Sequence, residues 1–183
     1  MIGEVLADPL FDAQQAYLTG DYVKAKEIIL PLAEEGNVLA QYNLAVIHIS
    51  TPDSIKNYQE AMKWFHLASL QGDADAQVWL GVMYDQGQGV IQDYQEAIKW
   101  YRLAAEHGNS NAQASLGIMY GEGQGVSKDD IRAYMWLDLA ASQGVNLAEH
   151  GRNLLAEKMT ISQINEAQKK TMNCKNSDYK NCD

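Results

Sequence analysis

Long hydrophobic runs, an excess of cations and catalytic motifs are all missing from this sequence. No apolar run reaches the about 18 residues that a membrane-spanning helix needs, so no transmembrane segment is predicted. Lys and Arg total 14 against 24 Asp and Glu, which gives a formal net charge of −10. Nucleic acid is therefore not expected as a partner, because phosphate binding needs a positive field. The sequence contains no His-Glu-x-x-His motif and no phosphate-binding loop, so we expect no enzyme activity, metal or cofactor.

The composition is otherwise that of a folded protein. Hydrophobic residues make up 46% of the 183 residues and charged residues 21%. This apolar content is enough for a core, and the length suits one ordinary domain or a short repeat array.

An internal repeat of 36 residues decides between these two possibilities. Residues 73–108 and 109–144 share 17 of 36 positions, and residues 37–72 and 73–108 share 14. Unrelated segments would share only about two or three. The constant positions are Gly36, Gly72, Gly108 and Gly144; Ala40, Ala76, Ala112 and Ala148; Leu44, Leu80 and Leu116; Ala61, Ala97 and Ala133; and Trp64, Trp100 and Trp136. Equal spacing over this length is typical of a helical repeat array.

Each repeat is predicted to be a pair of helices. Ala76, Leu80 and Tyr84 recur every four residues and predict a helix over 75–86. Gly81 lies within that stripe, which suggests that another helix packs too closely there for a side chain. The loop 87–90 ends the helix, Asp93 is a candidate cap for the next one, and that helix ends near Gly108. Stacking buries the alanine and tryptophan stripes between neighbouring pairs, and we expect the three repeated tryptophans to fill this space.

The flanks depart from the repeat as terminal caps should. The sequence divides into an extension at 1–9, an N-terminal capping unit at 10–36, repeats at 37–72, 73–108 and 109–144, capping helices at 145–172 and a tail at 173–183. Pro31 is predicted to kink the second helix of the first cap. Segment 50–54 replaces the glycine loop of the other repeats. Thr160 and Gln163 fit a capping box that opens the last helix, and the tail after about Met172 is expected to be irregular.

The pattern resembles the Sel-1-like repeat, a relative of the tetratricopeptide repeat with a longer connecting loop. The residues that carry the resemblance are Ala76-x3-Leu80-Gly81-x2-Tyr84-x2-Gly87-x-Gly89-Val90-x2-Asp93-x3-Ala97-x2-Trp100-Tyr101-x2-Ala104-Ala105-x2-Gly108. The resemblance implies an all-α fold, a right-handed superhelix of antiparallel helix pairs whose concave surface is lined by the first helix of each pair. It also implies a non-enzymatic adaptor or scaffold that binds other proteins, and many bacterial members are exported.

When the family's concave positions are carried over residue by residue, they predict a groove on the concave surface that binds a peptide or helix. Its candidate residues are Leu39, Tyr42, Asn43, Val46, Ile49, Asp75, Val78, Val82, Asp85, Gln86, Asn111, Ala114, Ile118, Glu122, Leu147, His150 and Leu154. The best anchors are Tyr42, Val46, Val78 and Val82. The alternative is that this stripe is partly buried by curvature or by a second copy of the chain.

The expected partner carries an apolar or basic segment. Asn43 matches the asparagine with which some tetratricopeptide proteins grip a C-terminal carboxylate. Segments 39–50, 75–86 and 111–122 contain no Lys or Arg, however, and a carboxylate clamp without cations is physically implausible.

Two other functional hypotheses remain open. Tyr84, Tyr94, Tyr101 and Tyr120 could stack on sugars of a cell-wall glycan, although tyrosines at repeat spacing are more often structural. Ser177 and Lys180 match the Ser-x-x-Lys motif of penicillin-binding hydrolases, and cysteine-rich relatives of the family have been linked with penicillin binding. The companion motifs of such a hydrolase are missing. His48 occupies the Tyr84 position of its repeat, where a packed histidine is favoured over a metal ligand.

The two cysteines and the N-terminus bear on the compartment. Cys174 and Cys182 do not have a zinc-site spacing and are candidates for a disulfide, with free thiols as the alternative. Segment 5–7 before Asp8 resembles the remnant of a signal-peptidase site. Export to the periplasm or the medium is therefore favoured over a cytoplasmic location.

Overall fold

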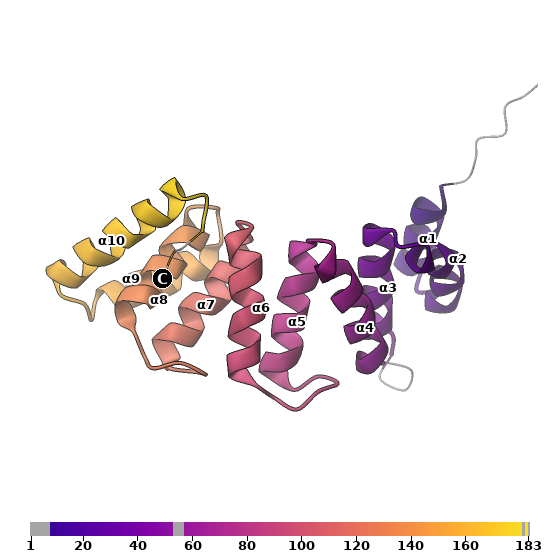
Figure 1. The fold of residues 1–183 in the computed structure, drawn as a ribbon, viewed down its shortest axis with the longest axis horizontal. Coiled ribbons are helices and arrows are strands. Elements are labelled where there is room, and N and C mark those ends of the chain that lie inside the picture. The colour runs from indigo at the N-terminus through magenta and orange to yellow at the C-terminus, as the bar shows by residue number, and fades with distance from the viewer. Residues whose placement is uncertain (1–7, 53–56, 181, 183) are drawn as a thin grey trace, which may run out of the picture. The chain divides into compact units, whose positions relative to one another are not determined.

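A computed structural model describes residues 8–52, 57–180 and 182 of the chain, and these form ten α-helices and no strand (Figure 1). The segment proposed as a signal remnant and the Asp53 and Ser54 part of the replaced loop lie outside these residues. The helices are α1 (Pro9–Leu18), α2 (Tyr22–Glu34), α3 (Val38–Ser50), α4 (Tyr58–Leu70), α5 (Ala74–Gln86), α6 (Tyr94–Glu106), α7 (Ser110–Glu122), α8 (Asp130–Ala141), α9 (Asn146–Ala156) and α10 (Ile161–Asn176). The odd-numbered helices α1 to α9 are called first helices here, and α2, α4, α6 and α8 second helices.

The chain forms two compact units, residues 1–76 and 77–183, and α5 crosses from one to the other. In the N-terminal unit, α1, α2 and α3 share a core that contains Ile29, Leu44 and Ile47. In the C-terminal unit, the largest core cluster contains Tyr101, Leu116 and Trp136. Each core is built from consecutive helices, as expected for a repeat array.

Side-chain caps fix where the helices begin. Asp93 accepts hydrogen bonds from the backbone N–H groups of Gln95 and Glu96, and Asp129 accepts one from that of Arg132. Thr160 and Gln163 form the predicted capping box at the start of α10. The candidate caps read from the sequence are therefore confirmed.

Two glycines allow first and second helices to approach closely, as the sequence predicts for Gly81, and Gly117 lies at the same position of the next repeat. A Cβ atom on Gly81 would lie 2.6 Å from the Tyr101 ring, and one on Gly117 would lie 2.6 Å from Cγ of Leu137. Real Cβ atoms do not make contacts this short, so a side chain at either position would push the helices apart.

The tryptophan prediction is correct for only one of three residues. Trp136 is 1% exposed, whereas Trp64 and Trp100 are half-buried. The residue after each tryptophan is buried in all three repeats, with Phe65 0%, Tyr101 2% and Leu137 6% exposed. The same face of each second helix therefore points into the core, and the third repeat buries Trp136 in addition, in the cluster that also contains the two cysteines.

The repeats share a buried glutamine that the sequence analysis did not single out. Gln41, Gln77 and Gln113 are 36 residues apart and almost fully buried. Gln71 donates to Gln41 Oε1 at 2.9 Å and Gln143 donates to Gln113 Oε1 at 2.8 Å, while His107 Nδ1 lies 3.3 Å from Gln77 Oε1. Gln41 also donates to the carbonyl of Ala33 in the preceding helix pair. These contacts satisfy buried polar groups, and the bond from Gln41 to Ala33 links its helix pair to the preceding one.

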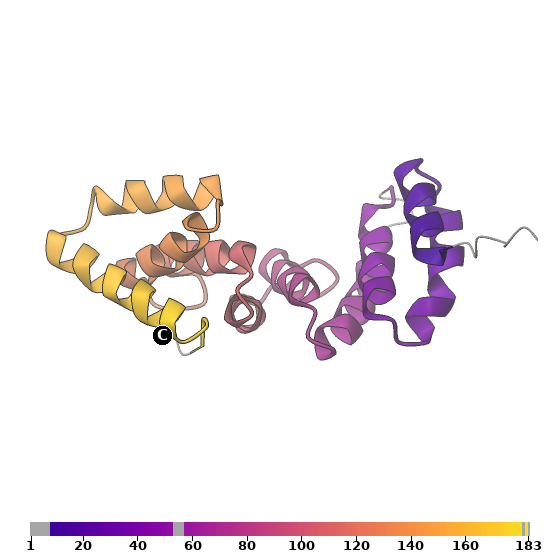
Figure 2. The same ribbon diagram turned by 90° about the horizontal axis from the view of Figure 1, so that it is seen from above.

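The C-terminal segment differs from the prediction of an irregular tail. α10 continues past Met172 to Asn176, and a disulfide joins Cys174 to Cys182. α10 packs against α8 through Ala167 and Tyr134. Figure 2 shows that α9 and α10 leave the turn at 157–160 in different directions. Helix therefore occupies the first part of the segment predicted as tail.

Candidate functional site

The N-terminal unit contains a pocket of about 510 Å³ between α1 and α3. Most of its lining is apolar. Its lining residues are Asp8, Leu10, Phe11, Ala13, Gln14, Tyr17, Leu18, Ile29, Leu39, Asn43, Val46 and Ile47. Its volume lies in the range of natural binding pockets.

Helical spacing places the lining side chains on the facing surfaces of the two helices. Leu39, Asn43 and Val46 follow the i, i+4, i+7 pattern on α3. Phe11 and Leu18 lie seven residues apart on α1, with Gln14 between them. Phe11 is 56% exposed, Leu18 67% and Leu39 51%, so large apolar side chains stand open to solvent around the pocket.

The polar groups of the pocket are few and have defined positions. Tyr17 Oη donates to Ser50 Oγ at 2.9 Å, which joins α1 to α3. Asp8 caps α1 by accepting a hydrogen bond from the N–H of Leu10 at 3.0 Å. Asn43 contributes a side-chain amide to the wall. An apolar cavity with a few fixed polar groups has the character of a binding site.

Three of the predicted groove residues of α3 line this pocket, namely Leu39, Asn43 and Val46. Tyr42 does not line it, because its ring packs against that of Phe65 with centroids 5.8 Å apart. Ile49 is half-buried and also does not line it. The N-terminal unit further holds Asp75, which is exposed near the start of α5.

Part of the predicted groove in the C-terminal unit is buried. Val78 and Val82 are half-buried and pack against the core, and Ala114 is buried in a cluster with Leu137 and Ala148. Val78 and Val82 are therefore only partly open to a partner, and Ala114, a predicted groove position, is covered by the protein's own helices. The predicted residues of this unit that remain exposed are Gln86, Asn111, Ile118, Glu122, Leu147, His150 and Leu154.

Two carboxylates give this face of the C-terminal unit its charge. Partial burial raises the pKa of Asp85, and the nearby Glu122 raises it further. Burial also raises the pKa of Tyr101, and the charge of Asp85 adds to that effect. The ends of α5 and α7 therefore share a negative field that a cation of a partner would relieve.

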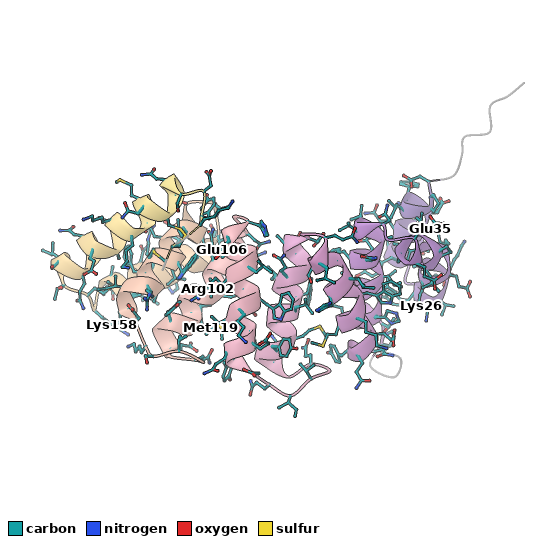
Figure 3. The ribbon with its side chains drawn as sticks, in the orientation of Figure 1. Lys26, Glu35, Arg102, Glu106, Met119 and Lys158 are labelled. Atoms are coloured by element: carbon teal, nitrogen blue, oxygen red, sulfur yellow. A yellow bond between two sulfur atoms is a disulfide. The ribbon has the colours of Figure 1, made fainter. Side chains whose placement is uncertain are left out.

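First and second helices differ in where they carry cations. α1, α3, α5 and α7 contain no Lys or Arg. The second helices carry cations, for example Lys26 on α2 and Arg102 on α6 (Figure 3). Arg152 on α9 is an exception, but it is paired with Asp138 at 2.9 Å. The first helices thus present apolar and acidic surface.

The residues behind the other two hypotheses have structural roles. Tyr101 and Tyr120 are buried, and Tyr84 and Tyr94 pack against the same core, so these tyrosines give the glycan hypothesis no support. Ser177 follows the C-terminal end of α10, where its Oγ lies within hydrogen-bond distance of the carbonyls of Cys174 and Lys180. A nucleophilic serine of the Ser-x-x-Lys type needs a helix start in a shaped cleft, and Ser177 has neither.

Metal and membrane sites are also not seen in the described part of the chain. No three His, Cys, Asp or Glu side chains among those residues are grouped as a metal site would require. The helices found there are too short or too polar to cross a bilayer.

Burial lowers the pKa of the half-buried His48, with a smaller effect from Lys26. His48 is thus a packed histidine of the N-terminal unit.

Sequence reasoning missed the contribution of α1 to the site. Phe11, Gln14 and Leu18 line the pocket, but the sequence analysis predicts residues 10–36 only as a capping unit. Their i, i+3, i+7 spacing was a usable signal. The contribution of α1 was missed because the candidate groove residues were taken from the family's repeat pattern, which begins after this segment.

Comparison with known proteins agrees with this architecture. The Sel1 repeat model matches residues 38–73, 74–109 and 110–145, more than half of the chain. No curated protein matches the sequence.

Two solved structures show the same kind of fold. One is the protective antigen c5321 of uropathogenic Escherichia coli strains, described as having an SLR fold, with 29% identity, a TM-score of 0.57, and coverage of 87% of this chain and 42% of that chain. The other is a Sel1 repeat protein from Oxalobacter formigenes, with 31% identity, a TM-score of 0.71, and coverage of 81% and 59%. The chain thus spans about half the length of these relatives. Taken with the three matched repeats, these findings establish that the chain belongs to the Sel1 repeat family.

Proposed function

We propose that this chain is a non-enzymatic scaffold that binds a partner protein through a short amphipathic segment carrying apolar side chains and Lys or Arg. Sel1 repeat proteins are generally protein-interaction scaffolds. The observation that carries the proposal for this chain is the apolar pocket between α1 and α3, on helices without a cation.

The apolar part of the partner supplies most of the affinity. Phe11, Leu18 and Leu39 are each more than half exposed at the pocket. Covering a Leu or Phe side chain completely contributes about 1.5–3 kcal/mol, so a partner that covers two or three of them gains a useful binding energy. A few such anchors dominate most interfaces.

The negative charge of the first helices favours Lys or Arg beside the apolar side chains of the partner segment. Asp8 lines the pocket and Asp12 lies on α1, and neither helix of the pocket carries Lys or Arg. Exposed ion pairs contribute only about 0–1 kcal/mol each, so a Lys or Arg of the partner adds selectivity more than affinity. An acidic segment would meet like charge at Asp8 and Asp12.

A random peptide display library, selected on the purified full chain, tests the proposal. We expect enrichment of peptides that combine aromatic or aliphatic residues with Lys or Arg. Enrichment of acidic peptides, or no enrichment above an unrelated helical protein, would overturn the proposal. Self-association of the chain in sedimentation, blocked by Leu39→Asp, would instead assign the pocket to a second copy and also overturn it.

A matched pair of variants locates the site. The double variant Phe11→Asp with Leu39→Asp should weaken binding of a selected peptide at least about tenfold, because it places charge at two anchors. Leu70→Asp changes an equally apolar residue that is 71% exposed on the second helix α4. We expect this control to bind like the unaltered chain. Equal loss in both would show that binding does not involve the pocket.

A further inference from the structure

The last helix ends in the same hydrogen-bonded motif as several earlier helices. After α10, the N–H of Asp178 donates to the carbonyl of Lys175 at 3.2 Å, and the N–H of Tyr179 donates to that of Cys174 at 2.9 Å. This pair of bonds is the Schellman motif, which needs a left-handed residue after the helix. Asp178 takes that conformation with φ 51°, and Tyr179 follows with φ 63°.

Five other helix ends use glycine at the position of Asp178. α1, α2, α4, α6 and α8 close with the same two bonds. Their left-handed residues are Gly20, Gly36, Gly72, Gly108 and Gly144, with φ between 80° and 93°. Asp178 and Tyr179 are the only non-glycine residues with positive φ in the part of the chain that the structure describes. A Cβ atom disfavours this conformation, so the turn after α10 needs an additional constraint.

The disulfide is in the right place to supply that constraint. Cys174 is the residue whose carbonyl accepts the bond from Tyr179, and Cys182 closes the loop behind it. Both cysteines are buried, at 1% and 8% exposure, and belong to the main core of the C-terminal unit with Tyr179 packed against them. The Tyr179 ring also lies on Gly108, in the turn between α6 and α7, about 3.4 Å from where a Cβ would be.

We propose that Cys174 and Cys182 are an oxidation site whose disulfide takes the place of glycine and clamps the left-handed C-terminal turn onto the α6–α7 turn. The clamp forms when the two thiols exchange with a disulfide oxidant of the thiol–disulfide exchange class. The Cys174–Cys182 bond forms, the bond of the oxidant breaks, and the oxidant leaves as two thiols with the two protons and two electrons. In the reduced chain the turn opens and Tyr179 leaves Gly108. α10 keeps its place on α8 through Ala167 and Tyr134.

Hydrogen exchange of the full chain tests the clamp. The amides of Asp178 and Tyr179 should exchange at least about tenfold faster after reduction, and also in the Cys174→Ser, Cys182→Ser variant, while those of α8 stay protected. Mass measurement with and without reductant establishes the redox state of each sample. Unchanged protection of both amides in the reduced chain and in the variant would overturn the proposal.

A glycine substitution separates the clamp from a general stabilising effect of the crosslink. Asp178→Gly should restore protection of these amides in the reduced chain, because glycine adopts the left-handed turn without help. Asn176→Gly, which places glycine at the right-handed last residue of α10, should not restore it. Equal exchange in the two reduced variants would show that the disulfide does not replace glycine, and would overturn that part of the proposal.

Discussion

The two units use the same repeat for different purposes. In the N-terminal unit the first helices leave a pocket open, with Phe11 and Leu39 exposed at its edge. In the C-terminal unit Val78 and Val82, which occupy the repeat positions of Tyr42 and Val46, are half-buried and pack against the unit's own core. The comparison teaches that the repeat pattern sets the helices, whereas the residues around each first helix decide whether its face stays open.

The largest expected effect tests where the C-terminal core is most filled. Trp136→Ala removes a fully buried indole and should lower the free energy of unfolding by about 3–5 kcal/mol in urea denaturation. Trp100→Ala removes a half-buried indole and should cost clearly less. Equal losses would contradict the inference that only the third repeat buries its tryptophan.

A smaller effect tests the close helix approach in the same unit. Gly117→Ala places a Cβ 2.6 Å from Leu137 and should cost about 1–3 kcal/mol. Gly121→Ala, one turn later in α7, places its Cβ 3.5 Å from Ala133, an ordinary contact. It should stabilise the helix by up to about 1 kcal/mol. A melting temperature of Gly117→Ala equal to or higher than that of Gly121→Ala would contradict the close packing at Gly117.

How much of this was predictable from the sequence depends on the kind of feature. Spacing predicted the repeats, the close approach at Gly81 and the cap Asp93, because each follows from local periodicity or backbone chemistry. Burial was predicted less well. The residues after the three tryptophans are all buried, and whether the tryptophan itself is also buried depends on contacts between helices that spacing does not give.

The candidate site was predicted in part for the same reason. Spacing placed Leu39, Asn43 and Val46 on one face, but whether that face stays open depends on neighbouring helices. Ala114 has the same helical periodicity and is buried because Leu137 and Ala148 cover it. The length of α10 was missed because its last turn packs into the core through Cys174, a contact with residues distant in sequence.

The smallest expected effect concerns the acidic face of the C-terminal unit. The raised pKa of Asp85 means that the folded chain holds this proton more tightly than the unfolded chain does. Stability contributed by Asp85 is therefore lost as pH rises from its usual pKa near 3.8 through the raised value. In the Asp85→Asn variant the free energy of unfolding should no longer fall over this pH range. The fall that Asp85 causes in the unaltered chain should be less than about 1 kcal/mol, because water screens its half-buried carboxyl.

Unfolding measured as a function of pH checks this effect. Glu122→Gln should make the fall in the free energy of unfolding with rising pH smaller, since Glu122 is the second cause of the raised pKa of Asp85 after burial. A stability profile of Asp85→Asn that parallels that of the unaltered chain over this range would contradict the assignment.

The central claim is that the partner segment lies on the first helices of the N-terminal unit. Hydrogen exchange of the full chain, with and without a library-selected peptide, tests it most directly. The account predicts slower exchange in α1 and α3, over residues 10–18 and 39–47, with α4 unchanged. Protection confined to α2 and α4, or to the C-terminal unit, would contradict it.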